Sequence, residues 1–136
     1  MMYLPEKTIA TLEFDKIRRM LAELARTEGA RTAALSLMPE SDPVRVLRLQ
    51  RRTTDAKRLA SDKGAPPFGS VKSISEHCDR ANKGAALTPR ELLDVANVLR
   101  TCRSLLDYSR VNRTYETVLD EVFERLLPDR KLEDKI

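Results

Sequence analysis

The segment from Thr88 to Leu106 limits the possible folds of this chain most strongly. It opens with the four residues TPRE, 88–91, a capping box in which Thr88 and Glu91 each accept the other's backbone N–H while Pro89 occupies the first helical turn. Apolar residues then recur at helical spacing on more than one face: Leu92, Leu93, Val95, Ala96, Leu99, Cys102, Leu105 and Leu106. A helix that is apolar on several faces must be covered by other elements, so we expect it to lie at the centre of the fold.

The composition also favours helices. Aromatic residues make up only 4% of the 136 residues, and four glycines are too few for a protein rich in β-hairpins. Strands prefer aromatic and β-branched residues, whereas Leu, Ala, Glu, Lys and Arg favour helices. A hydrophobic content of 41% allows a core to form, and a chain of this length suits one domain. We therefore predict an all-α fold, a bundle of about six helices forming a single domain over residues 1–136.

Capping residues and prolines indicate where the first helices begin and end. Apolar spacing after Pro5 predicts one amphipathic helix, or two joined near Thr11–Asp15, ending at about Arg26. Thr27 can cap the next helix, and Pro39 ends it because proline disfavours helical geometry in the residue before it.

The second half of the chain predicts further helices in the same way. The Asp42-Pro43 pair is a strong helix start, and residues 61–70 must form a loop because they include two prolines and two glycines. A helix is expected over 71–82, with Ile74, Cys78 and Ala81 inward, and Gly84 is expected to end it in the left-handed conformation. Another helix is predicted from 115 to 126. Residues 129–136 resemble the start of one more, so we expect the chain to be cut at its C-terminal end.

The helix that starts at Pro43 concentrates positive charge. Between Pro43 and Lys63, seven Lys and Arg residues against two Asp residues give a local balance of +5, in a chain of net charge +4. On a helical wheel, one narrow apolar arc holds Val46, Leu49, Thr53, Ala56 and Ala60. The arginines fall outside this arc, where they can hold phosphates through a salt-dependent, sequence-independent attraction. These candidate nucleic-acid-binding residues are Arg45, Arg48, Arg51, Arg52 and Arg58. The alternative is ion pairing with acids of a neighbouring helix, for example Glu116, Asp120 or Glu124.

No motif for catalysis is present in the sequence, which has neither a GxxxxGK[ST] nor a GxSxG nor an HExxH pattern. Ser73 and His77 have the spacing of a helical pair, but this spacing is common by chance. Asp120, Glu121 and Glu124 could hold magnesium, although a solvated acidic face is the favoured interpretation. Cys78 and Cys102 form no CxxC pair, and we expect buried free thiols. We predict no catalytic, cofactor-binding or metal-binding residue in this chain.

The sequence also lacks the features of a membrane or exported protein. No stretch approaches the ~20 apolar residues of a membrane span, and the N-terminus has no signal-type apolar run. We therefore expect no membrane partner and a cytoplasmic location.

The order of short motifs resembles the opening of bacterial MutS-two proteins. LEFDKI at 12–17 is followed by Thr27, Gly29 and Leu35, and then by Pro39 and Asp42. The loop GAPPFGSVKSI at 64–74 and the stretch NKGAALTPRELLDVANVLRTCRSL at 82–105 continue the resemblance, with Ala85 where a second glycine is usual and His77-Cys78 as a second departure. Each motif is short, but their joint order is specific and covers essentially the whole chain.

This resemblance implies the N-terminal helical core and lever region of a larger protein. MutS-two proteins are DNA-binding ATPases and endonucleases associated with suppression of homologous recombination and rescue of collided ribosomes. ATP and magnesium would be cofactors of the parent protein, its partners would be DNA and the ribosome or rRNA, and it would form a homodimer. The residues for ATP hydrolysis and strand cleavage would lie outside these 136 residues, which leaves a non-catalytic lever. The alternative is a free-standing helical protein-interaction module without a nucleic-acid role.

Overall fold

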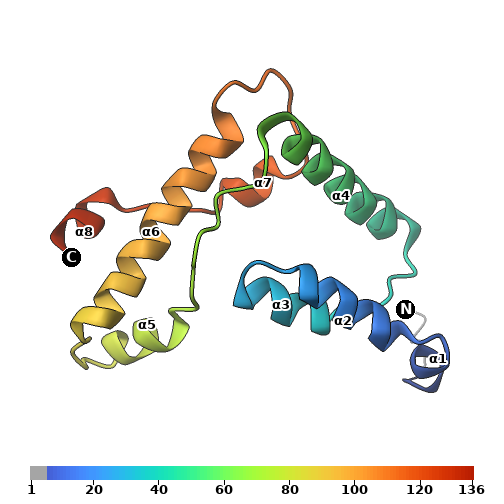
Figure 1. Cartoon of the computed structure of the whole chain (residues 1–136), viewed down its shortest axis with the longest axis horizontal. Helices are drawn as coiled ribbons and strands as arrows, with labels where there is room; N and C mark the ends of the chain where they lie inside the picture. Colours follow the sequence, from blue (N-terminus) through green and yellow to red (C-terminus); the bar gives the residue numbers. More distant parts are fainter. Residues whose placement is uncertain (1–5) are drawn as a thin grey trace. The chain divides into compact units, whose positions relative to one another are not determined.

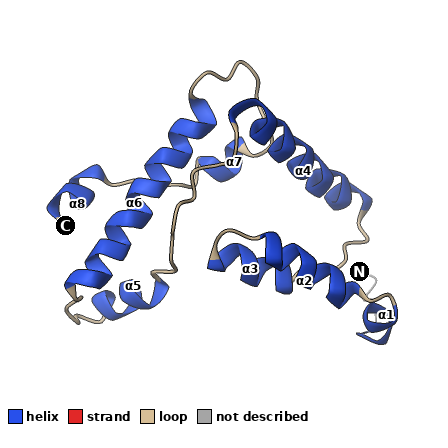
Figure 2. Cartoon of the chain, in the orientation of Figure 1, coloured by secondary structure: helices blue, strands red, loops and turns tan. Residues whose placement is uncertain are grey.

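Helices form all the regular structure of residues 6–136, which the computed structural model describes (Figure 2). This described range contains eight helices: α1 (Glu6–Thr11), α2 (Phe14–Leu24), α3 (Glu28–Leu35), α4 (Pro43–Lys63), α5 (Ser75–Asn82), α6 (Pro89–Arg110), α7 (Asp120–Phe123) and α8 (Arg130–Lys135). The all-α class is confirmed. The helices outnumber the predicted six because several are only one or two turns long. None of the helices from α1 to α8 has the length and apolarity needed to cross a membrane.

The chain divides into two compact units, one ending at Arg51 and the other running from Arg52 to Ile136. The helix α4 begins in the first unit and ends in the second (Figure 1). The single domain over residues 1–136 stays a prediction.

In the first unit, α2 packs against both α1 and α3. The break between α1 and α2 lies at Glu13, which has a left-handed φ of 54°, so the version with two joined helices is confirmed and Pro5 lies outside the described residues. Among the described residues of this unit, the buried side chains are those of Ile9, Ala22 and Ala34. Thr27 caps α3 as predicted, since its hydroxyl accepts the backbone N–H of Ala30 at 3.2 Å.

In the second unit, α6 lies at the centre and contacts α7 and α8. Its capping box is confirmed: the Thr88 hydroxyl accepts the Glu91 N–H at 3.3 Å, and the Glu91 carboxylate accepts the Thr88 N–H at 2.8 Å. Most residues of α6 are buried or half-buried, with Ala96 and Leu105 in the core. Gly84 has a φ of +84° and ends α5 as predicted.

Three helix boundaries differ from the predictions. Helix α3 ends at Leu35, before Pro39 is reached. The helix expected from residue 71 begins only at Ser75. The helix expected over 115–126 is reduced to the four residues of α7, because side chains of α4 bind the preceding segment in an irregular conformation, as described below.

The predicted inward faces of α4 and α5 are also wrong in part. Thr53, Ala56 and Ala60 are exposed, whereas Leu59 is buried and Arg52 and Asp55 are half-buried. At α5, the half-buried side chains are those of His77 and of Ile74, which immediately precedes the helix. Cys78 and Ala81 are exposed. Polar side chains form part of the packing face of each of these two helices. A helical wheel that marks only apolar residues therefore gives the wrong inward direction.

Candidate functional site

Three of the five candidate arginines, Arg45, Arg48 and Arg51, lie in the part of α4 that belongs to the first unit, and all three are exposed. Asp42 begins this helix as predicted, because its carboxylate accepts the backbone N–H of Val44 at 2.8 Å. The Nε atom of Arg45 lies 2.8 Å from a carboxylate oxygen of Glu40, yet the Arg45 side chain remains 64% exposed. Such an exposed ion pair contributes little to stability and can exchange for another anion.

The other two candidates, Arg52 and Arg58, lie in the second unit and have different surroundings. Arg52 is half-buried, and its Nε atom is buried without a hydrogen-bond partner in the described part of the chain. The guanidinium of Arg58 lies over the ring of Tyr115. The five arginines therefore do not share one environment. Arg58 is also exposed but lies over Tyr115, and Arg45, Arg48 and Arg51 are the exposed candidates of the first unit.

The acid groups considered as alternative partners include Asp120, which binds a different arginine. Arg113 donates to the Asp120 carboxylate at 2.6 Å, and the backbone N–H of Thr117 donates to its other oxygen at 3.0 Å. Partial burial raises the pKa of Asp120, but the hydrogen bonds from Arg113 and Thr117 outweigh it and hold the pKa below its ordinary value.

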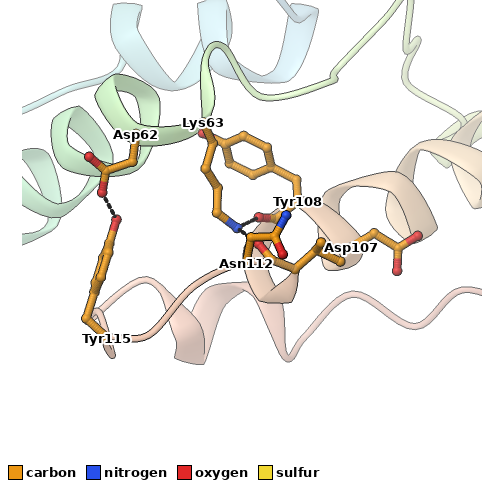
Figure 3. A pocket seen from close by; sticks show the side chains of 7 residues that line it. Asp62, Lys63, Asp107, Tyr108, Asn112 and Tyr115 are labelled. Atoms are coloured by element: carbon orange, nitrogen blue, oxygen red, sulfur yellow. Dashed lines mark hydrogen bonds between the residues drawn. The ribbon is translucent and has the colours of Figure 1, made fainter.

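The C-terminal ends of α4 and α6 meet at Lys63, the last residue of α4 (Figure 3). The Lys63 ammonium donates to the backbone carbonyls of Tyr108 and Val111. These carbonyls belong to the end of α6, where the last carbonyls lack helical partners and the helix dipole is negative. A cation from one helix thus caps the other, and the Tyr108 hydroxyl completes the contact by donating to the Gly64 carbonyl at 2.9 Å.

The segment between α6 and α7 is held on α4 by side chains about two helical turns apart. The Tyr115 hydroxyl donates to the carboxylate of Asp62 (Figure 3), and the Asp55 carboxylate accepts the Val118 N–H at 2.8 Å. We call this set of contacts, with those of Lys63, the α4–α6 junction. It borders a polar cavity of about 340 Å³ lined by Asp62, Lys63, Asp107, Tyr108, Val111, Asn112 and Tyr115.

The chemistry of the α4–α6 junction is structural. The hydrogen bond to Asp62 raises the pKa of Tyr115, and desolvation followed by the charge of Asp62 raises the pKa of Tyr108. Both phenols therefore stay protonated at neutral pH and serve as hydrogen-bond donors. The sequence analysis missed these residues, although a signal existed: Tyr108 and Tyr115 are two of only three tyrosines, and a packed tyrosine hydroxyl usually finds a partner.

Ser73 and His77, the residues considered for catalysis, do not form the helical pair that their spacing allows. Ser73 precedes α5, and its hydroxyl lies 3.5 Å from that of Ser75. His77 instead lies between two acids of α6, with 3.7 Å from Nδ1 to Glu91 and 3.8 Å from Nε2 to Asp94. This grouping ties α5 to the first turns of α6.

Within residues 6–136, no group of three His, Cys, Asp or Glu side chains is placed to hold a metal ion. The acids at 120, 121 and 124 do not fit magnesium, because Arg113 already binds the Asp120 carboxylate. Both cysteines are free thiols, as predicted, but Cys78 is exposed; burial raises the pKa of Cys102.

Comparison with known proteins identifies the family. Endonuclease MutS2 of Acetivibrio thermocellus is 36% identical over 134 residues, which cover 96% of this chain. The chain is a MutS2-family segment. Endonuclease MutS2 of Symbiobacterium thermophilum is 40% identical over 72% of the chain, and that of Bacillus cereus strain Q1 is 32% identical over 69%. The resemblance to the MutS-two family is thereby confirmed.

The matched MutS2 relatives are much longer than this chain, which spans 17% of the length of the Acetivibrio protein and 12% of the other two. The endonuclease activity in their names belongs to those long proteins. No family model matches the chain, and no solved structure matches it either.

Proposed function

We propose that this MutS2 segment is a non-catalytic helical region of a DNA-binding endonuclease, and that Arg45, Arg48 and Arg51 contact phosphate groups of the nucleic acid. The observation that carries the proposal is the exposure of three arginines at three-residue intervals on one helix. Arginine forms charge-assisted hydrogen bonds with phosphate. No base needs to be read, because phosphate contacts position a protein without carrying sequence information.

The wider role follows from the family. We place the segment near the N-terminal end of a cytoplasmic, homodimeric protein that uses ATP and magnesium, binds DNA and the ribosome or rRNA, suppresses homologous recombination and rescues collided ribosomes. The relatives' name, Endonuclease MutS2, supports the nuclease part of this proposal. We assign ATP and magnesium to the longer parent protein, and no site for either to these residues.

Within such a protein, the second unit would act as a lever. The α4–α6 junction joins the ends of two long helices through Lys63, Tyr108 and Tyr115. Helices joined at their ends by such hydrogen bonds would move together, because the bonded ends shift between discrete arrangements. A movement at one end of α6 would therefore reach α4.

The salt dependence of nucleic-acid binding tests the phosphate contacts. We expect the 136-residue chain to bind duplex DNA weakly, at about 10⁻⁴–10⁻⁶ M near physiological salt, with a log–log slope of about −0.9 per phosphate neutralised. The double variant Arg48→Gln, Arg51→Gln should flatten this slope by up to about two units. Arg58→Gln removes one charge from a residue that contacts Tyr115, and its slope should equal that of the unchanged chain. Equal slopes for the double variant and the unchanged chain would end the phosphate proposal.

A protein-interaction module is the second candidate, and exposed apolar side chains favour it. On α2, Ile17, Met20, Leu21 and Leu24 are between 44% and 80% exposed. Large exposed apolar surfaces on soluble proteins mark contacts with other proteins. If this candidate holds, light scattering will show concentration-dependent association of the chain, and replacing Met20 and Leu24 by Gln will abolish it without changing the salt slope of DNA binding.

A further inference from the structure

Two arginines of α6 converge on one carboxylate of α8. The Nη2 atom of Arg103 donates to both oxygens of Glu133, at 2.9 and 3.2 Å, and Nε of Arg100 donates to one of them at 3.2 Å. The Glu133 side chain is only 8% exposed, whereas those of Arg100 and Arg103 are 60% and 40% exposed. The arginine pair therefore forms a site that already holds an anion, and the anion comes from the same chain.

The carboxylate does not satisfy this site completely. The Nε atom of Arg103 is buried and has no hydrogen-bond partner among residues 6–136. A buried donor left without a partner is unfavourable, more so on a charged group. Three hydrogen bonds from the two arginines end on the oxygens of Glu133, and none of them comes from Nε of Arg103. Arginine binds a phosphate group through the same charge-assisted hydrogen bonds. A phosphate group also carries at least one further oxygen that could accept a hydrogen bond from Nε.

The element that supplies Glu133 is a short helix that packs against α6. Helix α8 has six residues, and helices this short have little stability of their own in water, so their packing contacts hold them in place. On α8, the Asp129 side chain caps the first turn, and the salt bridge to Arg100 and Arg103 joins the helix to α6. An anion that takes the two arginines would release this salt bridge.

We propose that Arg100 and Arg103 form a phosphate-binding site that Glu133 closes from within the chain. A phosphate group binds when Glu133 leaves, and the binding releases α8 from α6. The site lies on α6 and does not depend on the arginines of α4, so it stands or falls separately from the proposed DNA contacts. The phosphate can come from a free phosphate ion or from a nucleic-acid backbone, and the two sources are separated below by the choice of probe.

Calorimetric titration of the 136-residue chain with inorganic phosphate, and separately with a ten-nucleotide oligothymidylate, tests the proposal. Glu133→Gln keeps the shape of the side chain and removes the competing charge. Because both arginines of this ion pair are well exposed to water, we expect it to shift the equilibrium by up to about fivefold and this variant to bind the probe on the order of threefold more tightly. The matched control is Asp134→Asn, which removes the same charge from a side chain that is 70% exposed and faces Arg130. A gain with both probes indicates a general phosphate site, and a gain with the oligonucleotide alone indicates a backbone site.

Removing Arg103 tests whether the gain in affinity comes from a binding site formed by the arginines or only from the change in net charge. In the double variant Arg103→Gln, Glu133→Gln, the gain should disappear, and amide exchange in α8 should no longer respond to the probe. Equal affinities for Glu133→Gln and Asp134→Asn, or a gain that survives the loss of Arg103, would overturn the proposal. The Arg48→Gln, Arg51→Gln variant should bind inorganic phosphate as the unchanged chain does, which distinguishes a failure here from a failure of the DNA contacts.

Discussion

The guanidinium carbon of Arg58 lies 3.6 Å from the centre of the Tyr115 ring. The hydroxyl of the same tyrosine donates to Asp62, one helical turn after Arg58. Tyr115 is thus held by its face and by its tip on two successive turns of α4. This contact places the cation of Arg58, whose side chain is itself exposed, over an aromatic ring of the second unit.

Replacing Arg58 by Gln should therefore lower stability. A cation–π contact at an exposed site contributes about 0.5–1 kcal/mol, and we expect the free energy of unfolding to fall by that amount in urea titrations followed by circular dichroism. Arg51→Gln makes the same change of charge at an exposed position two turns earlier, and its effect should be close to zero. Equal losses for the two variants would contradict the assignment of Arg58 to Tyr115.

A substitution at Leu59 should lower the free energy of unfolding more than the substitution at Arg58 does. The Leu59 side chain is 2% exposed, and it lines an apolar cavity of about 300 Å³ together with Phe68 and Leu105. Truncating a buried leucine removes apolar contacts and enlarges the space behind them, so Leu59→Ala should cost about 2–5 kcal/mol. Leu93→Ala on α6, where the leucine is 64% exposed, should cost less than about 0.5 kcal/mol. Urea unfolding of both variants measures the difference, and a small loss for Leu59→Ala would mean that this residue is not part of the core.

The features that sequence analysis predicted correctly are those decided within one or two turns. The caps by Thr27, Asp42 and Thr88 satisfy backbone N–H groups two or three residues away. The helix end at Gly84 depends on a left-handed φ that glycine adopts without strain. Neighbouring residues supply everything these structures need, and the sequence therefore contains the information.

The features that it missed depend on residues far apart in the chain. The apolar spacing from 115 to 126 predicts a helix, but Tyr115 binds Asp62 and the Val118 N–H binds Asp55, and these contacts outweigh the local preference. Arg58 likewise looks like any exposed arginine until Tyr115 is placed beside it. The five candidate arginines are equivalent in sequence, and only their tertiary neighbours distinguish them.

Two glycines should respond in opposite ways to the same substitution. Gly29 lies in the first turn of α3, and Gly84 follows α5 with a φ of +84°; a Cβ atom at either position would meet nothing within 4 Å. Gly29→Ala should stabilise the chain by about 0.4–1 kcal/mol, because alanine loses less backbone freedom on folding. Gly84→Ala should destabilise it by about 1–2 kcal/mol through left-handed strain alone. Thermal unfolding by circular dichroism gives both signs, and a gain in stability for Gly84→Ala would contradict the assigned helix end.

Asp120 should make stability depend on pH in the acid range. Its folded-state pKa is lowered, since hydrogen bonds from Arg113 and Thr117 outweigh the effect of burial. A group with a lowered folded-state pKa stabilises the fold fully above its unfolded-state pKa, about 3.9 for aspartate, and loses this contribution as the pH falls through the folded-state value. The Arg113 side chain is 11% exposed and that of Asp120 is 25% exposed, so the pair is partly shielded from water.

At neutral pH, Asp120→Asn should therefore lower the free energy of unfolding by about 1–2 kcal/mol, between the values for exposed ion pairs and for hydrogen bonds to charged groups. As the pH falls below about 3.9 and through the lowered folded-state pKa, the gap between the variant and the unchanged chain should narrow, because the unchanged chain then loses the same charge by protonation. Urea titrations at a series of pH values measure this gap. Glu124→Gln removes a charge one turn later at an exposed position and should change stability by less than about 0.5 kcal/mol at neutral pH. A gap for Asp120→Asn that stays constant down to the acid limit would show that Asp120 contributes through its shape and not through its charge.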